Sequence, residues 1–210
     1  MPRRSETEKQ SGRRPVNTIR KQDIILAGVG GQGILSIAFV VDNAALKEGL
    51  NVKQAEVHGM AQRGGAVQSH LRLSSRRIWS DLIPRGGADL ILSVEPLEAL
   101  RYLDFLKPDG RIIASSNPFV NIPDYPDRDE VLAKIKKVPG SLVVDSEKLA
   151  KDAGASRAQN TVMLGAASKH LIVSEEHLKD YIRVLFEKRG ERILEANLKA
   201  FELGKAAADD

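Results

Sequence analysis

Apolar residues along this chain recur at two spacings, and each spacing predicts one type of element. Continuous apolar runs, or apolar residues alternating with polar ones, predict strands at residues 24–27, 52–57, 67–73, 88–94, 111–114 and 142–144. Apolar residues three and four positions apart predict helices at residues 34–47, 95–106, 129–137, 146–154, 160–171, 174–188 and 190–201. Strands that alternate with helices favour an α/β fold with a mostly parallel, Rossmann-like sheet and helices on both faces.

Local signals refine the ends of these elements. Residues 67–80 are expected to add an antiparallel hairpin, in which "SSRRIWS" supplies the turn and a short return strand. Pro96 suits the start of a helix, and Ser146 and Ser174 are the expected N-caps of later helices. The chain ends in helices, with residues 204–210 expected to fray. No internal repeat or boundary divides the chain, so a single domain is expected over residues 23–206.

The stretch "DIILAGVGGQGILSIAFVV" places a glycine-rich turn between a buried strand and a helix. Its glycines are Gly28, Gly30, Gly31 and Gly33. Three of them fit the G-x-G-x-x-G pattern of dinucleotide binding, and Glu56 follows near the distance at which an acidic residue would hold a ribose. Gln32, however, has no special use in a dinucleotide site. The glycines could also serve only to pack the helix close to its strand.

A second glycine segment, "HGMAQRGGA", follows the next predicted strand. It contributes Gly59, Gly64 and Gly65, and Arg63 between them suits a phosphate or a carboxylate. Glu56 and His58 could form an acid–base pair or simply anchor the loop, just as Arg63 could simply cap a carbonyl group. Loops at the carboxyl ends of neighbouring strands meet at one crevice. Both glycine segments are therefore expected to share one binding rim.

Composition excludes several classes of function. The chain has 42% hydrophobic residues and no cysteine, so it is globular and has no thiolate for an iron–sulfur cluster. Its four histidines form no metal-ligand spacing, and no apolar run reaches the ~18 residues that span a bilayer. The net charge of +4 lies partly in residues 1–22, a basic arm expected to be disordered. No nucleic-acid motif appears, and we expect a cytoplasmic protein without nucleic acid, membrane or metal.

Four stretches of the sequence resemble segments of one known protein family. "LAGVGGQGILSIAFVV" followed by "AEVHGMAQRGGAVQSHLRL" resembles the gamma domain of 2-oxoacid:ferredoxin oxidoreductases, and "HGMAQRGG" resembles the form found in small subunits of the indolepyruvate enzymes. "LILSVEPLEALRYLDFLKPDG" and "NTVMLGAAS" resemble the same family. The likeness spans residues 23–171 and continues weakly beyond, whereas the basic arm has no counterpart. Related subunits for pyruvate or 2-oxoglutarate more often differ between Glu56 and Arg63.

The resemblance implies an enzyme that works only as a complex. A larger alpha subunit would carry thiamine diphosphate and iron–sulfur clusters, decarboxylate an aryl 2-oxoacid oxidatively, pass electrons to ferredoxin and transfer the acyl group to coenzyme A. The rim would then face the larger subunit and coenzyme A, with the glycine turn offering backbone N–H groups and Arg63 holding a phosphate or an acidic partner residue. No catalytic residue is assigned to this chain.

The same residues also fit two other functions. A free-standing nicotinamide- or flavin-dependent oxidoreductase would use the G-x-G-x-x-G glycines and Glu56. A scaffold without catalytic contribution would only stabilise a larger chain.

Overall fold

A single twisted sheet organises the computed structural model, which describes residues 19–58, 64–120 and 122–209. Its strand order is β2-β3-β1-β4-β5-β6. The strands are β1 (Lys21–Val29), β2 (Asn51–His58), β3 (Ala66–Ser74), β4 (Ala88–Ser93), β5 (Leu106–Ser115) and β6 (Leu142–Val144). Strands β1, β4, β5 and β6 pair in parallel, whereas β3 runs antiparallel to both β1 and β2. The expected mostly parallel α/β sheet is confirmed.

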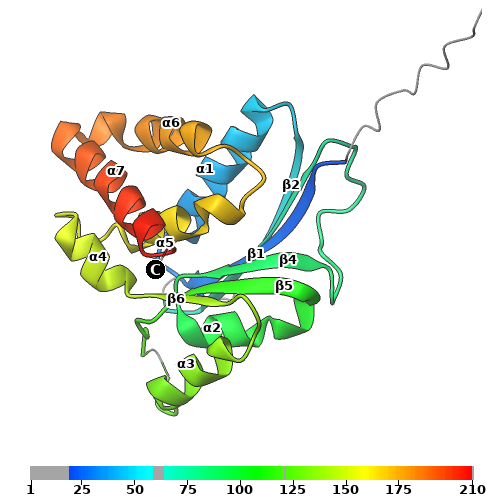
Figure 1. Ribbon diagram of the computed structural model, residues 1–210, viewed down its shortest axis with the longest axis vertical. Coiled ribbons are helices and arrows are strands. Elements are labelled where there is room, and N and C mark those ends of the chain that lie inside the picture. Colours follow the sequence, from blue (N-terminus) through cyan, green and yellow to red (C-terminus); the bar gives the residue numbers. More distant parts are fainter. Residues whose placement is uncertain (1–18, 59–63, 121, 210) are drawn as a thin grey trace, which may run out of the picture.

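Helices cover both faces of this sheet (Figure 1). They are α1 (Ile34–Lys47), α2 (Pro96–Arg101), α3 (Arg128–Lys136), α4 (Ser146–Asp152), α5 (Gln159–Ala167), α6 (Glu175–Phe186) and α7 (Glu191–Ala206), with short 3-10 turns at Leu103–Phe105, Ser168–His170 and Glu187–Arg189. One face packs against α1 and α4 to α7, and the other against α2 and α3. Alternate residues of β1 serve the two cores, with Ile24 and Leu26 on one side and Ile25 and Ala27 on the other. No described helix is long and apolar enough to cross a membrane.

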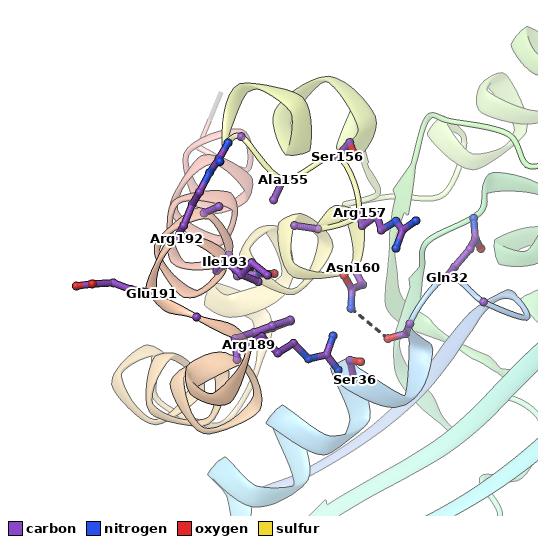
Figure 2. Close-up of a pocket in the computed structure, with 18 residues that line it drawn as sticks. Gln32, Ser36, Ala155, Ser156, Arg157, Asn160, Arg189, Glu191, Arg192 and Ile193 are labelled. Atoms are coloured by element: carbon purple, nitrogen blue, oxygen red, sulfur yellow. Dashed lines mark hydrogen bonds between the residues drawn. The ribbon is translucent and has the colours of Figure 1, made fainter.

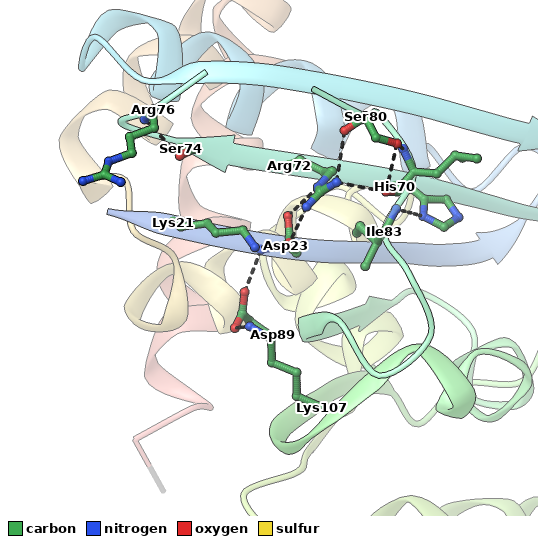
Figure 3. A network of polar contacts seen from close by, with 11 residues as sticks. Lys21, Asp23, His70, Arg72, Ser74, Arg76, Ser80, Ile83, Asp89 and Lys107 are labelled. Atoms are coloured by element: carbon green, nitrogen blue, oxygen red, sulfur yellow. Dashed lines mark hydrogen bonds and ion pairs between the residues drawn. The ribbon is translucent and has the colours of Figure 1, made fainter. Parts of the chain in front are cut away.

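The antiparallel excursion differs from its prediction. The hairpin pairs β2 with β3, and the predicted return strand in residues 74–80 is absent because that segment is irregular after Ser74. Side chains of β3 fasten the segment to the sheet instead. Arg72 donates to the carbonyl oxygens of Ser80 and Leu82, and its guanidinium also pairs with the buried Asp23 at 2.8 Å (Figure 3). These contacts replace the ladder hydrogen bonds that a return strand would have made.

Several element ends also depart from their predictions. Helix α2 begins after Glu95 as expected but ends at Arg101, since β5 already begins at Leu106. Asp145, not Ser146, caps α4, because its carboxylate accepts the N–H of Lys148. Ser174 does cap α6. Helix α7 continues through the tail expected to fray, as far as Ala206, because Gly204 packs against α5.

A buried carboxylate organises the irregular segment that follows β5. Glu95 is 1% exposed, and its side chain accepts the N–H of Glu98 at 2.8 Å and that of Phe119 at 3.2 Å. The hydroxyl of Tyr125 donates to the same carboxylate, and burial together with this hydrogen bond raises the Tyr125 pKa. Glu95 thus joins the end of β4 to a loop at the same edge of the sheet as the glycine turn.

Candidate functional site

The glycine turn after β1 is closed by its own side chain and by α5. The side-chain oxygen of Gln32 accepts the N–H of Val29 at 2.8 Å, which holds the turn against the strand it leaves. Gly33 forms the N-cap of α1 at φ 81°, a left-handed conformation that favours glycine. A methyl group there would lie 2.7 Å from the side-chain nitrogen of Asn160, which donates to the carbonyl oxygen of Gly33 at 3.3 Å (Figure 2). Gln32 therefore has a structural use, and a side chain at Gly33 would require both a strained backbone and displacement of the Asn160 side chain.

The two glycine segments meet through their backbones. The N–H of Gly30 donates to the carbonyl oxygen of Gly65 at 2.8 Å, and the N–H of Gly64 donates to that of Gly30 at 3.3 Å. We call this pair of hydrogen bonds the glycine clasp. It forms because β1 and β3 are antiparallel neighbours, which brings the end of one strand to the start of the other. The structure thus places Gly64 and Gly65, at the end of the second segment, beside the first glycine turn.

A cavity of about 830 Å³ opens beside the turn (Figure 2). Residues Gly31 to Gly33, the loop at residues 154–158 and the start of α7 surround it. Its cationic residues are Arg157, Arg189 and Arg192. In Figure 2, Arg157 and Arg189 extend toward Gln32 and Ser36, whereas Glu191 points away. Within the described part of the chain none of the three arginines forms an ion pair, so their charges are available to an anion.

This arrangement suits phosphate chemistry. The first turn of a helix has backbone N–H groups without intrahelical partners, and its dipole favours negative charge. Here the N-terminus of α1 faces a cavity that also holds guanidinium groups, which bind phosphate oxygens in pairs. The volume falls within the range of small-molecule pockets.

A smaller cavity of about 360 Å³ lies on the other side of the turn. Its lining is mainly apolar and includes Val29, Ile34, Leu35 and Val67. Glu56 also lines it, so this predicted residue does lie beside the glycine turn. The turn therefore separates a cationic cavity from an apolar one.

The remaining predicted residues divide into two groups. Gly28 lies in β1, where a methyl group would come within 2.7 Å of the Ile34 side chain, so it serves the packing of α1. His58 ends β2 opposite Val67, but its side chain lies outside the described residues, as do Gly59 and Arg63. The proposed roles of His58 and Arg63 therefore stay predictions.

Sequence reasoning missed the residues that form the far wall of the large cavity. Asn160 opens the segment "NTVMLGAAS", which carried part of the family resemblance but no site role. Arg189 and Arg192 flank Gly190 in "KRGER", a basic cluster at a helix boundary that could have signalled an anion site. Across residues 19–58, 64–120 and 122–209, no three histidine or acidic side chains gather where they could hold a metal ion.

The sheet order bears on the nicotinamide alternative. In a dinucleotide fold the acidic residue follows the strand next to β1, but here β3 lies between β1 and β2. Glu56 is thus one strand further away, about 5 Å, than the fingerprint requires. The large cavity also lies on the α7 side of the turn, away from Glu56. The alternative is not supported.

Known proteins match the chain over most of its length. Residues 23–207 match the family described as Pyruvate ferredoxin/flavodoxin oxidoreductase. Indolepyruvate oxidoreductase subunit IorB of Thermococcus kodakarensis is 37% identical over 202 residues, which cover 91% of this chain and 98% of that protein. IorB of Archaeoglobus fulgidus is also 37% identical, over 87% of this chain and 92% of that protein.

Solved structures agree. The 2-oxoglutarate:ferredoxin oxidoreductase of Magnetococcus marinus, solved with 2-oxoglutarate, coenzyme A and succinyl-CoA bound, matches 90% of this chain with a TM-score of 0.71 and 26% identity. This chain spans about a third, 31%, of that longer polypeptide. A keto/oxoacid ferredoxin oxidoreductase gamma subunit of Geobacter sulfurreducens matches 89% of this chain and 98% of its own, with a TM-score of 0.64 and 25% identity. The chain therefore belongs to the pyruvate ferredoxin/flavodoxin oxidoreductase family and corresponds to the small, or gamma, subunits of its 2-oxoacid:ferredoxin oxidoreductases.

Proposed function

We propose that this chain is the small subunit of an enzyme that converts an aryl 2-oxoacid such as indolepyruvate, coenzyme A and two oxidised ferredoxins into acyl-CoA, carbon dioxide, two reduced ferredoxins and a proton. This proposal rests mainly on the 37% identity with IorB of T. kodakarensis over 98% of that subunit. Because this chain has no cysteine, the iron–sulfur clusters belong to a larger alpha subunit. The same subunit would hold thiamine diphosphate, which supplies the decarboxylation chemistry.

Within that complex, the cavity beside the glycine turn takes the phosphate groups of coenzyme A. Three arginines without ion-pair partners in the described chain and the N-terminus of α1 border it. Coenzyme A carries a diphosphate and a 3′-phosphate, so it needs several cationic or N–H contacts at once. The glycine clasp fixes the turn from the opposite side.

Reconstitution of the complex from both subunits tests this role. Arg157→Ala and Arg189→Ala should each raise the KM for coenzyme A about tenfold, which corresponds to one lost charge-assisted contact, with kcat unchanged. Arg85→Ala is the matched control, since Arg85 is 79% exposed and pairs with Asp104 far from this rim. An unchanged KM in both cavity variants would remove the coenzyme A assignment.

The same reconstituted complex tests two further hypotheses, the role given to Arg63 and the scaffold function. Arg63→Ala that alters neither assembly nor the apparent affinity for coenzyme A would refute the role given to Arg63. Full activity of the larger subunit without this chain, together with normal copurification, would favour the scaffold function instead.

A further inference from the structure

An unpartnered apolar stripe runs along α1. Leu35, Phe39 and Leu46 are 52%, 37% and 56% exposed, although most exposed helix positions carry polar residues. At 100° per residue, these three and Asp42 fall within about 60° of one another. We call this face, Leu35, Phe39, Asp42 and Leu46, the α1 stripe.

The stripe borders the uncovered edge of the sheet. Figure 1 shows α1 as the outermost helix of its layer, with α6 and α7 on one side and the edge strand β2 on the other. Leu35 also lines the small apolar cavity at the glycine turn, so the stripe is continuous with the rim that carries the glycine clasp. A contiguous apolar face beside an edge strand is a typical interaction surface.

Asp42 adds a chemical requirement to this surface. Its Oδ1 atom is buried and has no hydrogen-bond partner in the described part of the chain. Burial raises the pKa of Asp42 to about 7. A buried carboxylate oxygen without a donor is destabilising. Asp42 as a residue is only partly buried, so a cationic side chain that docks on the stripe can approach its carboxylate.

Two occupants fit this surface poorly. In a two-fold pairing of α1 stripes, Asp42 lies near the middle of the contact and would meet its own copy, which brings no cationic side chain to its carboxylate. The chain's residues 1–18 contain no leucine, isoleucine or aromatic residue, so they cannot fill a face of Leu35, Phe39 and Leu46.

A larger partner chain fits better. In the M. marinus relative the matching region is 31% of a longer polypeptide, so the equivalent domain there is attached to a much larger body. We propose that the α1 stripe is the docking surface for an amphipathic helix of the larger subunit, which packs apolar side chains on Leu35, Phe39 and Leu46 and directs one Lys or Arg to Asp42. This inference rests on the proposed function, because it requires that a larger subunit exists.

The test uses the full chain and the organism's own larger subunit, immobilised for a binding titration. Phe39→Asp and Leu46→Asp should each weaken binding about 30-fold, the effect common at an interface hot spot. Asp42→Asn, which keeps shape but removes charge, should weaken it about tenfold. Val184→Asp on α6 is the matched control, since Val184 is 50% exposed and lies outside the stripe, and its affinity should stay within about twofold of wild type. Thermal melts verify that each variant folds, and Leu46→Asp carries the test if Phe39→Asp is unstable.

The outcomes are distinct. If wild type binds the larger subunit and both stripe variants bind equally well, the docking surface is wrong and the proposed function stands. If wild type does not bind at all, the proposed function fails and the docking proposal fails with it. If the isolated chain is a dimer that Phe39→Asp converts to a monomer, a second copy occupies the stripe and the proposal is overturned.

Discussion

Helices α5 and α7 cross where each has a glycine against the backbone of the other. A methyl group on Gly165 would lie 2.8 Å from the carbonyl carbon of Phe201, and one on Gly204 would lie 2.7 Å from that of Val162. In both cases the carbonyl oxygen is closer still. Because backbone atoms form the obstacle, no change of rotamer can relieve the overlap. Gly165→Ala must therefore push the two helices apart.

The size of the effect follows from two opposing contributions. Overpacking a dense contact costs about 1–3 kcal/mol, and the rigid obstacle here places Gly165→Ala at or above the upper end. Alanine offsets about 1 kcal/mol of that through its better helix propensity. Gly165→Ala should therefore lower the free energy of unfolding by about 2 kcal/mol, which corresponds to a fall in Tm of about 4–8 °C for a chain of this size.

A double variant sharpens this prediction. Gly165→Ala and Gly204→Ala open the same contact, so the second methyl group enters a gap that the first has already made. The destabilisation of the double variant should be about 1 kcal/mol smaller than the sum of the two single destabilisations. Urea unfolding and thermal melts measure both quantities, with Lys199→Ala, exposed on α7, as the control. An unchanged Tm in either single variant, or strict additivity, would show that the helices do not cross at these glycines.

Two pH-dependent predictions involve carboxylates. Burial raises the pKa of Asp42 from 3.8 to about 7, so the free energy of unfolding of the isolated chain should fall as pH rises between these values. Asp42→Asn should therefore be about 1–2 kcal/mol more stable than wild type at about pH 8. Urea unfolding should show no such advantage below pH 3.8. Burial acts to raise the pKa of Glu48, but hydrogen bonds from Arg20, Ser174 and His177 outweigh it and lower that pKa from 4.5 to about 2. The stability that Glu48 contributes is therefore complete above pH 4.5 and lost as pH falls through about 2. Glu48→Gln should cost about 1–2 kcal/mol at about pH 7, and its unfolding curve should converge with that of wild type near pH 2; parallel curves would contradict the assigned hydrogen bonds.

Periodicity was sufficient to predict most of the fold but not its sheet order. The strand and helix patterns appear as elements close to their expected ranges. The insertion of β3 between β1 and β2 left no periodic signal, because strand pairing depends on contacts between distant segments. The absent return strand has a similar cause, since it depends on Arg72 and His70, whose side chains bind the backbone near Leu82 and Ile83.

For a related reason, the sequence predicts the glycine turns of the site but not the opposite wall of the cavity. Glycine-rich turns are visible in the local sequence, but the expected reason for their meeting was wrong. Strands β1 and β2 are not neighbours, and it is the start of β3 that brings Gly65 to Gly30. Arg157, Asn160 and Arg189 reach the same place only because α5 packs against α1 and α7 packs against α5. Nothing in their local sequence reports that packing.

The glycine clasp is made by main-chain atoms alone. Its two hydrogen bonds join Gly30, Gly64 and Gly65, so no side chain takes part in them. We therefore expect substitutions at residues 59–63 that keep Gly64 and Gly65 to leave this closure intact, which makes the segment a suitable position for engineering new binding chemistry.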